Sequence, residues 1–174
     1  HSVTGVQTCA LPIFLGVMLL LLGNGIQSTL LGIRGKIEGF SPVEMSYVMS
    51  AYYAGFLFGS RFTPDMIRRV GHVRVFAALG SMISAVLILY PVAPNWILWA
   101  GMRVVIGFSF AGVYITAESW LNASSTNETR GQALSAYMIM QMIGIIASQV
   151  VLNFSDPSGF DLFIISSILV SVAF

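Results

Sequence analysis

The sequence predicts an all-α integral membrane protein, because its few charged residues are kept apart from long apolar runs. Only eight basic and seven acidic residues occur among the 174, and hydrophobic residues make up 56% of the chain. Each of the first five apolar runs holds about 20 residues, the length that a helix needs to cross a hydrocarbon core of roughly 30 Å. These runs lack the polar face of a soluble amphipathic helix. We therefore expect a multi-pass helical bundle in a lipid bilayer.

Helix boundaries follow from changes in composition and from helix-breaking residues. Ser41 to Glu44 (SPVE) form a capping box with proline at the first helical position. Pro91 and Pro94 separate the third helix from the fourth, and residues 125–128 offer caps for the fifth. The connectors are short, so we expect consecutive helices to be antiparallel neighbours. The expected helices span residues 14–33, 42–62, 72–92, 96–121, 131–154 and 161–174, the sixth being truncated.

The first 13 residues are interpreted separately from the rest. Residues 3–13 (VTGVQTCALPI) resemble the translation of a widely used sequencing-adaptor oligonucleotide. We expect residues 1–13 to be a non-native read-assembly artefact that should be left out of fold reasoning. A short N-terminal leader is the alternative. The transmembrane domain is then expected over residues 14–174.

The distribution of cations predicts how the bundle is oriented. Five arginines lie in or beside the connectors that join helices two and three and helices four and five, against two cations in the opposite connectors. Cytoplasmic connectors carry an excess of Lys and Arg. We therefore expect these two connectors, and the N-terminus with them, to be cytoplasmic. The five arginines are Arg61, Arg68, Arg69, Arg74 and Arg130, and the opposing cations are Arg34 and Lys36.

Arg103 carries the clearest functional signal, because it stands inside the fourth apolar run. It lies eight residues beyond the preceding turn, about 12 Å along a helix that rises 1.5 Å per residue. An arginine at membrane depth costs roughly 2.5–3.5 kcal/mol on insertion scales, so it should face protein or a water-filled cavity. The alternative is that it snorkels to the outer headgroups. One helical stripe, which we expect to face away from lipid, holds Arg103, Gly107, Ala111, Tyr114 and Glu118.

Uncharged polar side chains of the first and fifth helices are further candidates. Asn24, Gln27 and Ser28 share one face of the first helix. Gln141, Ser148 and Gln149 share a face of the fifth. Such side chains either hold helices together or line a solute path. The sequence alone leaves both alternatives open.

Glu118 lies one turn before the cytoplasmic end of the fourth helix. It is a candidate to pair with Arg68 or Arg69 of the neighbouring connector, in an ion pair that opens and closes with a conformational change. It is alternatively a candidate proton site, or a solvated carboxylate at a helix end. No carboxylate lies at mid-membrane depth in the first five helices, so the sequence leaves proton coupling open.

Several short motifs resemble those of the major facilitator superfamily of transporters. Residues 103–107 (RVVIG) resemble the arginine–glycine motif of the superfamily's fourth helix, and residues 68–74 (RRVGHVR) resemble its loop signature between helices two and three. In that loop the acidic residue, Asp65, stands three residues earlier than the signature places it. Residues 127–131 (NETRG), which open the fifth helix, are also similar to the superfamily.

The motifs look most like a bacterial branch of poorly defined substrate. That likeness rests on residues 118–122 (ESWLN) together with residues 71–76 (GHVRVF). The fifth helix lacks the glycine–proline motif of drug–proton antiporters, since residues 144–147 read GIIA, and this argues against multidrug efflux. The resemblance covers about residues 14–174, essentially the first half of a family member.

The resemblance implies the six-helix N-terminal half of a twelve-helix bundle whose two halves rock around a midplane site. It implies secondary active or facilitative transport of a small solute across the bacterial inner membrane, with the missing C-terminal half as partner and a proton as a candidate coupling ion. The candidate cavity residues are Arg103, Asn24, Gln27, Tyr114, Gln141 and Gln149. The candidate gating residues are Arg68, Arg69, Gly71, Glu118 and Arg130.

Other classes of function have less support. No glycine-rich phosphate loop, metal-ligand spacing or nucleophile motif points to an enzyme, a metal or a cofactor, and a net charge of +1 provides no basic patch for nucleic acid. A non-transporting membrane scaffold or sensor is one alternative, although it has no need of Arg103. An inactive gene fragment is the other, because half of a two-fold carrier cannot form the pathway.

Overall fold

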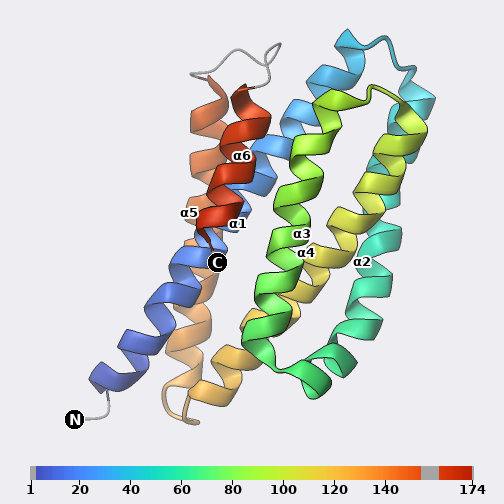
Figure 1. The fold of residues 1–174 in the computed structure, drawn as a ribbon. Coiled ribbons are helices and arrows are strands. Elements are labelled where there is room, and N and C mark those ends of the chain that lie inside the picture. The colour runs from blue at the N-terminus through green and yellow to red at the C-terminus, as the bar shows by residue number, and fades with distance from the viewer. Residues whose placement is uncertain (1–2, 154–160, 174) are drawn as a thin grey trace.

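The chain forms a bundle of helices (Figure 1). The computed structural model describes residues 3–153 and 161–173, with side chains from residue 13 onward, and these ranges contain no strand. The all-α fold class is therefore confirmed. The elements are α1 (Val3–Ile37), α2 (Pro42–Val70), α3 (His72–Leu89), the 3₁₀ turn η1 (Tyr90–Val92), α4 (Trp96–Ser124), α5 (Arg130–Asn153) and α6 (Asp161–Val172).

Four segments are long and apolar enough to cross a membrane, judged by length and composition. They are Ile13–Ile37, His72–Val92, Trp96–Ser124 and Arg130–Asn153. α2 is long but less apolar, and α6 is apolar but shorter. The described part of the chain is thus a helical membrane domain.

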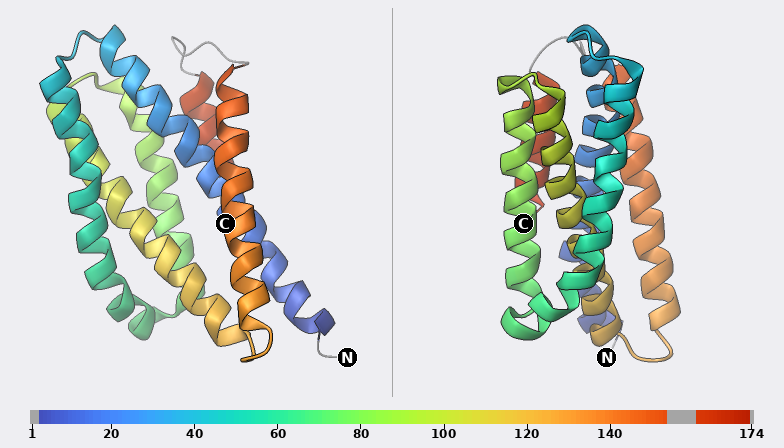
Figure 2. Two further views of the ribbon diagram at one scale, coloured as in Figure 1. Left: turned by 180° about the vertical axis from the view of Figure 1, so that it is seen from behind. Right: turned by 90° about the vertical axis from the view of Figure 1, so that its right-hand side faces the viewer.

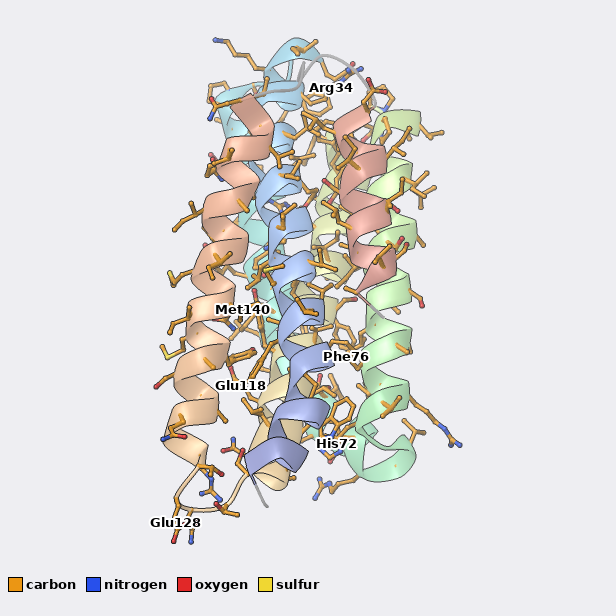
Figure 3. All side chains as sticks on the ribbon, turned by 90° about the vertical axis from the view of Figure 1, so that its left-hand side faces the viewer. Arg34, His72, Phe76, Glu118, Glu128 and Met140 are labelled. Carbon is orange, nitrogen blue, oxygen red and sulfur yellow. The ribbon has the colours of Figure 1, made fainter. Side chains whose placement is uncertain are left out.

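The connectors gather at two opposite ends of the bundle, as Figures 1 and 2 show. The α2–α3 and α4–α5 connectors lie at one end, and the α1–α2 and α3–α4 connectors lie at the other. Figure 3 shows the same separation of side chains, with Arg34 at one end and His72 and Glu128 toward the opposite end. The arginine-rich connectors therefore share one side of the molecule.

Helix pairing agrees with the sequence prediction only in part. The most extensive contacts join α2 to α4 and α1 to α5, which are not consecutive, whereas the consecutive helices α3 and α4 also pack closely. α6 lies against α1 and α3. Glycines allow α2 and α4 to pack closely. A Cβ added at Gly55 would collide with the Val104 carbonyl, and one added at Gly107 would collide with the Tyr52 carbonyl. Glycine at these positions lets two backbones approach closely. Close helix packing therefore explains the glycines at these two positions.

Several helix boundaries also need correction. α2 ends at Val70, not Phe62; α4 ends at Ser124, not Leu121; and α1 runs from Val3 to Ile37 instead of over residues 14–33. Apolar runs mark only the part of a helix that suits hydrocarbon, whereas hydrogen bonding continues into the polar ends. Ion pairs lie at two of these ends, since Arg34 near the end of α1 pairs with Glu38 at 2.7 Å and Arg68 near the end of α2 pairs with Asp65. The expected end of the fifth helix at residue 154 lies outside the described residues.

Hydrogen bonds define the starts of α2 and α4. Ser41 caps α2 as predicted, because its Oγ accepts from the Glu44 N–H at 3.3 Å and its own N–H donates to Glu44 at 2.7 Å. At the start of α4, Trp99 is fully buried and its indole N–H donates to the carbonyls of Tyr90 and Ala93, at 3.2 and 3.0 Å. These bonds anchor α4 to the turn before it.

Candidate functional site

Arg103 projects from α4 into the interior of the bundle and is only 4% exposed. Its Nη1 donates to Gln27 Oε1 of α1 at 3.4 Å, and its Nη2 lies 3.2 Å from Met49 Sδ of α2. The guanidinium carbon also lies 5.5 Å from the centre of the Tyr52 ring, within cation–π range. Side chains of two other helices therefore hold Arg103 inside the bundle, and the snorkelling alternative is wrong.

The face of α1 that the sequence singled out meets this arginine. Gln27 is fully buried, and Asn24 and Ser28 lie within a turn of it. Asn24 Oδ1 and Arg103 Nε are buried in this group without a hydrogen-bond partner, whereas the Gln27 amide lies next to the buried Tyr90 hydroxyl. Buried polar atoms are usually paired.

A cavity of about 260 Å³ opens beside these atoms, between α1, α2 and α4. We call it the arginine cavity. Tyr52 is half-buried in its wall, and Tyr53, packed edge-to-face against Tyr52 at 5.6 Å, is 69% exposed. The cavity is lined by Asn24, Ser28, Met49, Tyr52, Tyr53 and Arg103.

The arginine cavity carries an unbalanced positive charge. Within residues 3–153 and 161–173, the ion pairs are Arg34–Glu38 and Arg68–Asp65, and neither involves Arg103. A buried cation without a carboxylate partner is costly, and a weak sulfur acceptor and an aromatic face offset only part of that cost. The arrangement is chemically suited to receive an anion.

Of the six predicted cavity residues, Asn24 and Arg103 line the arginine cavity, and Gln27 contacts Arg103 without lining it. The other three lie elsewhere. Tyr114 packs between the rings of Phe56 and Phe110, with centroids 6.4 and 6.0 Å away. Gln141 is half-buried on α5, and Gln149 is exposed, with its Nε2 bonded to Ser148 Oγ at 3.3 Å. Ser148 itself faces Gly25 of α1. The α5 glutamines therefore do not line the arginine cavity, because α5 packs against the other side of α1.

The predicted gating ion pair is not formed in this conformation. Arg68 pairs with Asp65 within α2, which lowers the pKa of that carboxyl below its usual 3.8 through a hydrogen bond and the nearby charge. Glu118 is exposed and Figure 3 places it toward the end of the bundle that holds His72. At that end, His72 Nε2 lies 3.0 Å from Ser119 Oγ and joins α3 to α4.

The other two gating candidates, Gly71 and Arg130, lie at helix ends. Gly71 has φ +87°, a conformation that favours glycine, and its N–H donates to the Ile67 carbonyl at 2.9 Å as α2 ends. Arg130 is exposed at the first position of α5, where its backbone N–H donates to the Thr126 carbonyl at 2.9 Å. Both residues therefore set helix ends, and their gating roles stay predictions.

The comparison with known families settles the classification. The model of the Major Facilitator Superfamily matches residues 13–174. The chain belongs to the major facilitator superfamily.

Relatives within the superfamily are identical to this chain at about a quarter of the aligned positions. It is similar to the uncharacterized MFS-type transporter YcaD of Salmonella arizonae, with 27% identity over 79% of the chain and 36% of that protein. It is also similar to an uncharacterized MFS-type transporter of Enterobacter sp. (strain 638), with 26% identity over 84% of the chain and 39% of that protein. No solved structure matches at a significant level. The chain thus spans little more than a third of these relatives' length.

Sequence reasoning missed two residues of this major facilitator site. Met49 supplies the sulfur contact of Arg103, and the fully buried Tyr90 lies near enough to act on Arg103 electrostatically. A methionine in an apolar helix gives no signal of its own, and Tyr90 stands in a turn that was interpreted only as a helix break. No group of three or more metal-ligating side chains occurs among the described residues.

Proposed function

We propose that this chain forms the N-terminal half of a transporter that moves a small solute across the bacterial inner membrane by alternating access. Family membership and the membrane-spanning helices support a transport role. The observation that carries the proposal is the buried Arg103 beside an open polar cavity. Two roles are open to it: binding an anionic part of the solute, or tuning a nearby proton site.

A second set of helices is proposed to complete the pathway. The arginine cavity has walls from α1, α2 and α4, and the outward faces of α2 and α5 carry many exposed apolar side chains. The two relatives are more than twice as long as the region they share with this chain. We propose that the remaining helices cover these faces and that the two halves rock about the cavity.

The proposed orientation places the N-terminus and the arginine-rich connectors in the cytoplasm. In the outward-facing state Glu118 would pair with Arg68 or Arg69, and Arg68 would then exchange its present partner Asp65 for Glu118. Coupling to protons would require Glu118 or a group from the remaining helices, and a facilitator without coupling is equally compatible with the described residues.

Replacement of Arg103 tests the proposal. In cells that express the full-length gene, uptake or efflux should be measured with a panel of radiolabelled organic acids, sugars and amino acids and with fluorescent dyes. Arg103→Ala should abolish movement of every transported member, while membrane insertion stays intact. Arg61→Gln, an exposed arginine of α2, is the matched control and should transport normally. Unchanged transport by Arg103→Ala would remove this residue from the mechanism.

The same assay distinguishes transport from two other functions of the chain. A scaffold or sensor would show no movement of any panel member, and an inactive fragment would show none until the remaining helices are supplied.

Long-read sequencing of the gene checks the proposal that residues 1–13 are not native. The gene should lack these codons and should encode further apolar helices after Phe174. A gene that contains codons 1–13 and encodes no further helix would contradict the half-transporter proposal.

A further inference from the structure

A second cavity, of about 460 Å³, opens against α4 where α2 ends and α3 begins. We call it the connector cavity, because it lies at the end of the bundle that holds the α2–α3 and α4–α5 connectors (Figure 1). Among the described residues, none lines both this cavity and the arginine cavity. The connector cavity is lined by Pro64, Ile67, Arg68, His72, Ile115 and Ser119.

Polar and apolar lining residues are separated along the helix axes. Arg68 stands one turn beyond Pro64 toward the end of α2, and Ser119 stands one turn beyond Ile115 toward the end of α4. The 29 residues of α4 span about 43 Å, which exceeds a hydrocarbon core of roughly 30 Å, and Ser119 lies five residues before the end of this helix. The polar part of the cavity should therefore lie at the level of lipid headgroups, and the apolar part at the level of acyl chains.

The polar part offers accessible hydrogen-bond donors from three helices. The Arg68 side chain is 76% exposed, and its ion pair with Asp65 leaves further N–H groups of the guanidinium for a ligand. His72 Nε2 lies 3.0 Å from Ser119 Oγ, and both residues are only half-buried. Whichever of these two groups donates, a neutral imidazole and a hydroxyl keep one further donor between them.

The charge around the cavity is positive. Residues 61–74 contain four arginines against one acidic residue, Asp65, and Glu118 beside Ser119 adds one more negative charge. His72 is also the first residue of α3, whose start has no side-chain cap, so the positive end of that helix dipole lies at the cavity. Basic pockets between transmembrane helices bind anionic lipid headgroups. A cationic mouth above an apolar wall suits an anion that carries an apolar tail.

We propose that the connector cavity binds an anionic phospholipid, whose phosphate accepts from Arg68 and from the His72–Ser119 pair. An acyl chain of the lipid lies against the three apolar lining residues. A soluble phosphate ester has the same anionic group but gains nothing from the apolar wall. This binding depends neither on Arg103 nor on transport.

Native mass spectrometry of the purified full-length protein, released from detergent, measures the binding of matched probes. The probes are dioleoyl phosphatidylglycerol, dioleoyl phosphatidylcholine with the same chains but no net charge, glycerol 3-phosphate and inorganic phosphate. Phosphatidylglycerol should bind at least about fivefold more tightly than phosphatidylcholine, the usual effect of one cation on an anionic lipid. Neither soluble phosphate should displace phosphatidylglycerol at equal concentration, because neither contacts the apolar wall.

Variants then locate the site. Arg68→Gln should weaken the binding of phosphatidylglycerol by about fivefold or more, because it removes a cation that touches the phosphate. Arg69→Gln is the matched control: it removes the same charge from the adjacent position of α2, outside the cavity. It should weaken binding by no more than about twofold in roughly 0.15 M ammonium acetate, which screens charges that do not touch the lipid. Ile115→Trp is an independent variant that fills the apolar part, and it should also weaken binding of the lipid.

Three results would overturn the inference. Equal binding of phosphatidylglycerol and phosphatidylcholine would show that the anionic charge is not recognised. Displacement by glycerol 3-phosphate or inorganic phosphate at equal concentration would assign the cavity to a soluble phosphate. Equal weakening by Arg68→Gln and Arg69→Gln would mean that the general surface potential, and not the cavity, attracts the lipid.

The outcome is separate from that of the transport proposal. A protein that transports a panel member without preferring phosphatidylglycerol would contradict this inference alone. A protein that binds phosphatidylglycerol at Arg68 but moves no panel member would leave the inference standing and contradict the transport function.

Discussion

At the scale of single residues, the position of Arg103 shows how a cation is kept inside an apolar bundle. Three weak partners replace one strong partner: an amide oxygen, a thioether sulfur and an aromatic face. A cation–π contact contributes about 0.5–2 kcal/mol, and the amide oxygen and the sulfur add to it. None of the three partners carries a negative charge, so we expect the guanidinium to be able to accept an anion.

The structure predicts a lowered pKa for the Asp65 carboxyl. Its bond to Arg68 is the main cause of a lowered pKa, while Arg61 and Arg69 contribute less. A lowered folded-state pKa means that the pair's contribution is present above the ordinary pKa of 3.8 and is lost as pH falls through the folded value. We expect the Asp65 carboxyl carbon, followed by NMR in detergent micelles, to titrate below pH 3.8.

Two arginine variants test that assignment. Arg68→Gln should return the Asp65 pKa most of the way toward 3.8, because it removes both the hydrogen bond and the closest charge. Arg69→Gln should move it much less. Equal effects of the two substitutions would show that general positive potential, and not the Arg68 contact, controls this carboxyl.

At the scale of elements, the α2–α4 contact depends on glycines that face backbone. A Cβ at Gly107 would lie 2.9 Å from the Tyr52 carbonyl carbon and 3.0 Å from the Phe56 nitrogen. Backbone atoms cannot move aside as the end of a side chain can. Since Tyr52 also borders the arginine cavity, the spacing of these helices sets the shape of the site.

Gly107→Ala should therefore destabilise the protein by about 1–3 kcal/mol, the usual cost of overpacking. Gly101 of the same helix is the matched control, because nothing lies within 4 Å of the position its Cβ would take. Gly101→Ala should be neutral or stabilising, by up to about 1 kcal/mol. Thermal unfolding followed by tryptophan fluorescence in detergent measures both variants. A lower midpoint for Gly101→Ala than for Gly107→Ala would contradict the close backbone contact of α2 with α4.

Much of each element could be predicted from the sequence, but the pairing of elements could not. Composition located the helical segments, the Ser41–Glu44 capping box marked the start of α2, and depth in the membrane singled out Arg103. Hydropathy is a property of one segment, so it does not record that α4 neighbours α2 more closely than α3. Met49 was missed for that reason: its role exists only through α4.

At the scale of the whole molecule, the connectors divide the charges between two ends. The α2–α3 connector, which follows Arg68 and Arg69, lies at the same end of the bundle as the connector that precedes Arg130 (Figure 1). Connectors near the cytoplasmic face retain Lys and Arg during insertion. This end should therefore face the cytoplasm, and the end that holds η1 should face outward.

Two exposed valines provide a matched test of that orientation. Val70 ends α2 at the arginine-rich side and is 47% exposed, and Val92 ends η1 on the opposite side and is 73% exposed. Each is replaced by Cys in a cysteine-free full-length background. The arginines and the lysine on which the orientation prediction rests are therefore all kept. A membrane-impermeant maleimide should label Val92→Cys in intact cells and Val70→Cys only after lysis. The reverse pattern would place the N-terminus outside and transfer the proposed Glu118–arginine ion pair to the outer face, where it would close the cavity against the opposite compartment.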